Sequence, residues 1–186
     1  AVRVEPAAAG CKLVLDSGTA LDCDLLVVGV GVAPVTDFLA GSGVDLDRGV
    51  LVDDTMRSSV PNIWAAGDVA QARGFYDGAK TLNGILPDAV EQGRIAGMAM
   101  AGDPGMRAYP GGVPLNTYTF FGRHAVSVGV HGDGVAGAEV VKTVDADRGR
   151  YLKIVLADNR LLGIFGIGTA FDPGVMWELV LRRTDL

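Results

Sequence analysis

The chain has 186 residues, of which 49% are hydrophobic and 20% charged. This composition predicts a globular core, and this length predicts one domain or two small ones. The net charge is −6, and no part of the chain offers the basic surface that nucleic acid needs. No apolar run approaches the ~20 residues of a membrane span. We therefore expect no nucleic-acid or membrane partner. The two cysteines, Cys11 and Cys23, are not spaced as C-x-x-C and fit a reducing cytoplasm.

The beginning of the chain predicts a hairpin that leads into a buried strand. Lys12–Leu15 and Thr19–Leu21 have strand character and are separated by a polar turn. Leu25–Val28 is a continuous apolar run, as in a strand buried on both faces of a parallel sheet. Gly29-Val30-Gly31 ends it. Because these glycines do not form G-x-G-x-x-G, we interpret them as a strand-to-loop crossover and not as a complete dinucleotide cradle.

The middle of the chain predicts short strands and one long helix. We expect a short helix at Thr36–Ala40, a short strand at Val50–Val52 and a buried strand at Ile63–Ala66. The stretch "LPDAVEQGRIAGMAMAG" predicts a helix. Pro87 suits its first position and Gly102 its C-terminal cap.

The last third predicts antiparallel structure. "NTYTFFGRHAVSVGV" favours two strands around Gly122-Arg123. "AEVVKTVDADRGRYLKIVLADNRLLGIFGIG" favours a three-stranded meander with turns at Asp145–Gly149 and Asp158-Asn159. "DPGVMWELVLRR" predicts a final amphipathic helix. The chain therefore divides near residue 106 into an α/β part and an α+β part.

One acidic residue, Asp68, follows Gly67 at the end of the expected strand Ile63–Ala66. Ligands of an open parallel sheet bind outside the carboxyl ends of its strands. A carboxylate can accept hydrogen bonds from two hydroxyls, so a polyol or ribose is one candidate ligand. Gly67 would let that ligand approach the backbone. The alternative is a helix N-cap or a turn aspartate without a ligand.

The start of the Pro87 helix is a second candidate site. Leu86, in the N-cap position, offers no side-chain oxygen, so the free N–H groups are left for water, backbone or a ligand. A helix start also favours an anion. The alternative is an ordinary amphipathic helix, in which Asp88 and Glu91 offset the dipole.

Metal and triad chemistry have no support in the sequence. His124 and His131 have no carboxylate or cysteine at metal-ligand spacing. There is also no Ser-His-Asp or Cys-His constellation. We therefore predict no metal site and assign no catalytic residue.

Three stretches carry a family resemblance: "DLLVVGVGVAP", "GVLVDDTMRSSVPNIWAAGDVA" and "AVEQGRIAGMAMAG". They resemble the carboxyl-terminal half of the FAD-dependent pyridine nucleotide-disulfide oxidoreductases, in the branch of NADH oxidase, rubredoxin reductase and nitrite reductase. The resemblance implies a partial FAD/NAD(P)-binding, Rossmann-like parallel sheet, then an α+β interface domain with an antiparallel meander. Residues 1–33 would be the tail of the NAD(P)-binding domain and 34–106 part of the FAD-binding domain. Residues 107–186 would form the interface and dimerisation domain.

The resemblance also implies cofactor contacts. Asp68 would hydrogen-bond the ribityl chain of FAD, with Gly67 and Val69 beside it. The backbone of Pro87-Asp88-Ala89 would face the pyrimidine edge of the flavin, where a helix start favours negative charge near N1. Gly29-Val30-Gly31 would lie near the nicotinamide of NAD(P)H.

Departures from the family pattern imply a fragment. Both G-x-G-x-x-G cradles, the redox cysteine and the His-Glu pair of the glutathione reductase branch are absent. We expect part of a cytoplasmic flavoprotein that passes hydride from NAD(P)H to FAD and on to a protein, disulfide or small-molecule acceptor. It would dimerise through residues 107–186. The isolated fragment would be inactive and bind FAD weakly or not at all. The alternative is a free-standing interaction or dimerisation module with a flavoprotein-like fold and no flavin.

Overall fold

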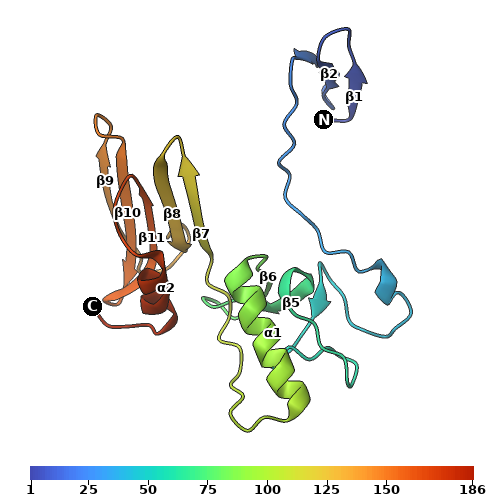
Figure 1. Ribbon diagram of the computed structural model, residues 1–186, viewed down its shortest axis with the longest axis vertical. Coiled ribbons are helices and arrows are strands. Elements are labelled where there is room, and N and C mark those ends of the chain that lie inside the picture. The colour runs from blue at the N-terminus through green and yellow to red at the C-terminus, as the bar shows by residue number, and fades with distance from the viewer. The chain divides into compact units, whose positions relative to one another are not determined.

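The computed structural model describes all 186 residues, which form two units, Ala1–Ala33 and Pro34–Leu186. The first unit holds a three-stranded antiparallel sheet in the order β1-β2-β3 (Figure 1). Its strands are β1 (Arg3–Pro6), β2 (Cys11–Val14) and β3 (Ala20–Cys23). The predicted hairpin corresponds to β2 and β3, and β1 adds a third strand that the sequence analysis missed.

The buried strand predicted at Leu25–Val28 is wrong. The segment has no regular secondary structure, and Leu25, Val27 and Val28 are 78%, 81% and 70% exposed. A strand of a parallel sheet needs neighbouring strands to pair its backbone groups, and no segment of this chain pairs with residues 25–28. The run has the composition of a buried strand but no partner among these residues.

The second unit begins with short elements around one long helix. They are η1 (Asp37–Leu39), β4 (Val50–Leu51), η2 (Gly67–Val69), β5 (Ala70–Arg73), β6 (Lys80–Leu82) and α1 (Leu86–Ala101). β4 and β5 are parallel, and β6 pairs antiparallel with β5. Ile95 and Ala96 of α1 share a core with Val50 and Ala70 of the strands. The predicted long helix is confirmed, and Gly102 caps it in the left-handed conformation, with φ 64°.

The buried strand predicted at Ile63–Ala66 is also wrong. Trp64 makes only an isolated antiparallel bridge with Arg57, and the Ala65 N–H donates to the Met56 carbonyl at 3.0 Å. This segment satisfies its backbone groups on the turn that precedes it, while β5 takes the place beside β4. Asp68 therefore lies before a strand and not after one.

The rest of the unit is a five-stranded antiparallel sheet with one helix (Figure 1). The strand order is β7-β8-β11-β10-β9, and the strands are β7 (Leu115–Phe120), β8 (Arg123–Gly129), β9 (Glu139–Asp145), β10 (Arg150–Ala157) and β11 (Arg160–Ile167). Helix α2 (Pro173–Leu181) packs on β8 and β11, with Val180 in the core. The predicted strand pair, meander and final helix are confirmed. No helix combines the length and apolar character that a membrane crossing requires.

Candidate functional site

The Gly67-Asp68 turn presents an unpaired carboxylate. It forms one 3-10 turn, η2, in which Gly67 has a φ of 79°, a conformation that glycine adopts without strain. Asp68 is exposed, and no hydrogen bond or ion pair occupies its carboxylate. A Cβ placed on Gly84 would lie 3.4 Å from Asp68 Oδ2, so this glycine keeps one side of the carboxylate open. The turn can therefore offer two acceptor oxygens to a ligand.

The start of α1 lies against this turn. The N-cap residue is Ile85, one position earlier than the sequence predicts, and no side chain caps the helix. A Cβ on Gly67 would lie 3.5 Å from the Ala89 Cβ, an ordinary van der Waals contact. The Gly67 N–H also donates to Gln92 Oε1 at 2.8 Å. The structure thus brings together the candidate stretches Gly67–Val69 and Pro87–Ala89.

The Asp88 side chain points into the protein and away from solvent. It is 2% exposed and accepts hydrogen bonds from Tyr109 and from the Asn83 amide. Burial raises the pKa of Asp88 to about 6, although the two hydrogen bonds act in the opposite direction. Only the backbone of Asp88 remains as a candidate ligand contact.

The third candidate stretch, Gly29-Val30-Gly31, belongs to the unit Ala1–Ala33. All three residues are exposed, and Gly31 has a φ of 77°. They lie in an irregular segment that opens no helix. This agrees with a loop rather than a dinucleotide cradle, and the role near a nicotinamide stays a prediction.

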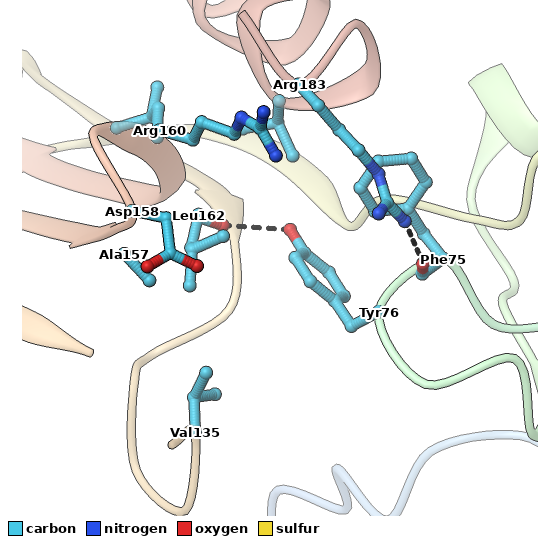
Figure 2. A pocket seen from close by; sticks show the side chains of 10 residues that line it. Phe75, Tyr76, Val135, Ala157, Asp158, Arg160, Leu162 and Arg183 are labelled. Atoms are coloured by element: carbon cyan, nitrogen blue, oxygen red, sulfur yellow. Dashed lines mark hydrogen bonds between the residues drawn. The ribbon is translucent and has the colours of Figure 1, made fainter. Parts of the chain in front are cut away.

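Several hollows lie in the second unit, among them a cleft at α1 and a cavity at the β10–β11 turn. A cleft of about 580 Å³ runs between the first turns of α1 and helix α2, and its walls include Leu86, Pro87, Val90, Tyr109 and Trp177. A smaller cavity of about 200 Å³ lies between Phe75-Tyr76, the β10–β11 turn and the end of α2 (Figure 2). There Arg183 stacks on Phe75, and the Tyr76 hydroxyl donates to the Leu162 carbonyl at 2.8 Å. The larger cleft adjoins the candidate site.

The histidines and cysteines lie in the strands or pack against them. His124 lies in β8, 3.4 Å from Thr119 Oγ1, and His131 stacks on Phe165. No group of three His, Cys, Asp or Glu side chains in the chain could hold a metal ion. The free thiols Cys11 and Cys23 are direct cross-strand partners in β2 and β3, a pairing that their sequence separation conceals.

Sequence reasoning missed the polar side chains behind the site. Asn83, Gln92 and Tyr109 hydrogen-bond to Asp88, to the Gly67 turn or to each other. Helical spacing offered a signal for one of them. Asp88, Gln92 and Ala96 recur every four residues, which places them on one face of α1, and all three are buried.

Solved structures with this arrangement include a FAD-dependent oxidoreductase and a ferredoxin reductase. A FAD-dependent pyridine nucleotide-disulphide oxidoreductase from Desulfovibrio vulgaris superposes with a TM-score of 0.76 at 26% identity, over 99% of this chain and 48% of that one. The ferredoxin reductase for the CYP199A2 system of Rhodopseudomonas palustris gives a TM-score of 0.70 at 27% identity, over 89% and 40%. The predicted fold class, a mixed α/β fold of the FAD/NAD(P)-binding oxidoreductases, is confirmed.

The sequence profile of the pyridine nucleotide-disulphide oxidoreductases matches residues 1–98, and the chain belongs to this family. The NADH-dependent phenylglyoxylate dehydrogenase subunit epsilon of Aromatoleum evansii is 59% identical over the whole chain, which covers 44% of that protein. The nitrite reductase [NAD(P)H] of Bacillus subtilis is 28% identical over 91% of the chain, which covers 20% of it. The chain thus spans less than half the length of these relatives. The resemblance identified from the three motifs is confirmed.

Proposed function

We propose that this chain is part of a flavoprotein oxidoreductase, in which Asp68 binds the ribityl hydroxyls of FAD and the start of α1 faces the flavin ring. One observation carries the proposal: the exposed carboxylate of Asp68 has no partner and stands beside an uncapped helix start. The carboxylate can accept from two hydroxyls. The helix start favours the negative charge that a reduced flavin develops near N1.

The residues present fit part of the cofactor. Gly84 places no side chain against the carboxylate, and Gly67 and Ala89 are small where the turn meets the helix. The pyrophosphate has no equivalent site, because the chain contains no G-x-G-x-x-G sequence. We therefore infer that FAD is held jointly by these residues and by a phosphate cradle that is not among them. Residues 34–106 would belong to the FAD-binding domain.

The chemistry that FAD supplies when bound is transfer of hydride from NAD(P)H and release of electrons to an acceptor. The residues of this chain bind and orient the cofactor, and we assign none of them to catalysis. Gly29-Val30-Gly31, in the tail of the NAD(P)-binding domain, would lie near the nicotinamide. The 59% identical relative is named as a subunit of an NADH-dependent dehydrogenase, which supports a nicotinamide nucleotide as one redox partner and a place beside other protein subunits. Dimerisation through residues 107–186 and a cytoplasmic location complete the proposal.

Replacement of Asp68 tests the site. In the full protein that carries this chain, Asp68→Ala removes charge-assisted hydrogen bonds and should weaken FAD binding by about 10- to 100-fold. Titration of the apoprotein with FAD, followed by flavin fluorescence, measures the change. Asp133→Ala is the matched control, because it removes another exposed carboxylate without a hydrogen-bond or ion-pair partner, far along the sequence in the β8–β9 loop.

The outcomes separate the two candidate functions. Unchanged FAD affinity in Asp68→Ala contradicts the role of Asp68. A full protein that carries no flavin and does not oxidise NAD(P)H contradicts the oxidoreductase. A stable dimer without flavin would then favour the interaction module.

A further inference from the structure

Gln92 lies at the centre of a buried polar chain that the flavin contacts do not use. Its side chain is 1% exposed. Its Oε1 accepts from the Gly67 N–H at 2.8 Å, and its Nε2 donates to the Tyr109 hydroxyl at 3.2 Å. One amide therefore ties α1 both to the Asp68 turn and to the segment that follows the helix.

The hydrogen bonds that link Gly67, Gln92 and Tyr109 have only one consistent donor-to-acceptor direction. A backbone N–H can only donate, so the Gln92 oxygen must face Gly67 and the amide nitrogen must face Tyr109. The Tyr109 oxygen then accepts, and its proton is free to donate to the Asp88 carboxylate. Burial raises the pKa of Tyr109, so the hydroxyl keeps that proton at neutral pH.

The Asp68 turn depends on the hydrogen bond between Gly67 and Gln92 to keep its conformation. It is a single 3-10 turn, and it starts at a glycine, the residue with the greatest conformational freedom. The Asp68 carboxylate makes no hydrogen bond that would place it. The side-chain hydrogen bond that holds the turn is the one that Gln92 Oε1 accepts from the N–H of Gly67, the residue before Asp68.

We propose that Gln92 is a positioning residue for flavin binding, which holds the Gly67 N–H and so places the Asp68 carboxylate against the start of α1. The inference rests on the proposed role of Asp68. Gln92 itself is buried behind the turn and would touch no part of the cofactor.

A double-mutant cycle in the full protein tests this inference. Gln92→Leu leaves the Gly67 N–H unpaired and should weaken FAD binding by about tenfold. In the Asp68→Ala background the same substitution should add less than about twofold, because the carboxylate that it misplaces is gone. FAD is titrated into all four apoproteins. Glu91→Gln is the control, since Glu91 precedes Gln92 on α1 and its carboxylate pairs with Arg94 at the surface.

A second variant and a second measurement keep the test decisive. Tyr109→Phe keeps the ring and the Gly67 bond but removes the hydroxyl that accepts from Gln92 and donates to Asp88. It should weaken FAD binding by about threefold, again only when Asp68 is present. Hydrogen exchange of the Gly67 amide in the apoprotein should be faster in Gln92→Leu than in Glu91→Gln. If Gln92→Leu does not fold, the Tyr109→Phe cycle decides.

Different results overturn different claims. Equal weakening with and without Asp68 would mean that Gln92 acts only through general stability, and the positioning role would be wrong. The same holds if Asp68→Ala weakens FAD binding while Gln92→Leu does not. If Asp68→Ala itself has no effect, the proposed flavin contact fails first.

Discussion

Two regions of the second unit are built in different ways. Residues 44–109 contain short strands of two to four residues, whereas the strands of β7–β11 have six to eight. All four buried polar side chains of the chain lie in the first region: Ser58, Gln71, Asp88 and Gln92. The core of the second region is apolar. Side-chain hydrogen bonds therefore hold the loops of the first region, and strand ladders organise the second.

Gln71 shows the same device as Gln92. Its Oε1 accepts from the backbone N–H groups of Arg48 and Gly49 at 3.0 and 3.3 Å, and its Nε2 donates to Asp47 at 2.9 Å. Each glutamine thus holds a loop that has no ladder of its own. A buried donor or acceptor without a hydrogen-bond partner destabilises the folded state, so each loop keeps the conformation in which these bonds form. A region that presents loops to a ligand needs such bonds to hold the loops in place.

The largest predicted effect comes from a substitution in the apolar core of the second region. Ile164 is 6% exposed in β11 and lies between its cross-strand partners Val128 and Ile154. Ile164→Ala should lower the free energy of unfolding by about 3 kcal/mol. The two tryptophans allow each region to be followed alone, since Trp64 lies in the first and Trp177 in the second. Urea unfolding is followed by tryptophan fluorescence in two backgrounds. Trp177→Phe leaves Trp64 to report the first region, and Trp64→Phe leaves Trp177 to report the second.

The Trp177 transition should move more than the Trp64 transition. Val140→Ala is the control, because Val140 is 50% exposed on β9 and its truncation should change little. Equal shifts of both tryptophans would break the comparison, because they would show that the two regions unfold as one.

How much of the fold is predictable depends on where an element finds its partners. Leu25–Val28 and β11 are both apolar runs, but only β11 has neighbouring strands within the chain. Composition cannot show that difference. The prediction of a buried strand at Ile63–Ala66 was wrong for a related reason, since this segment pairs with the turn just before it. The meander and α1 were predictable because their turns, caps and partners are close in sequence.

The candidate site follows the same rule. Asp68 and the Pro87 helix start could be found because each is a local motif. The bond from Gly67 to Gln92 joins residues 25 apart, and the bond from Gln92 to Tyr109 spans 17 more. No local pattern specifies either bond. The positions of a site can thus be predicted while the side chains that support it cannot.

A pH series sharpens the comparison, with an effect on the order of 2 kcal/mol. The pKa of Asp88 is raised to about 6, so between pH 4 and pH 6 the folded state holds a proton that the unfolded state has lost. The stability from this group is present below pH 4 and is lost as the pH rises through 6. Asp88→Asn should abolish this slope in the Trp64 transition. Urea midpoints at pH 4, 5, 6 and 7 measure it.

Asp53 provides a control of opposite sign. Burial raises its pKa, but hydrogen bonds from Thr55 and Arg57 outweigh burial and lower the pKa overall. Its stability is therefore present above pH 4 and is lost as the pH falls below that value, so Asp53→Asn should not remove the Asp88 slope. The Trp177 transition should show no such slope, since no Asp or Glu side chain is buried in the core of the second region. A slope that survives in Asp88→Asn would contradict the assignment.

The smallest effects concern the surface, where the two regions should not differ. Arg73 pairs with Asp54 at 3.3 Å in the first region, and Arg148 pairs with Asp145 at 3.2 Å in the second. Both pairs are solvent-exposed, so Arg73→Ala and Arg148→Ala should each lower the free energy of unfolding by less than about 0.5 kcal/mol. The same two tryptophan backgrounds measure them. A clearly larger loss for Arg73→Ala would mean that charges on the surface, and not only the buried amides, hold the loops of the first region.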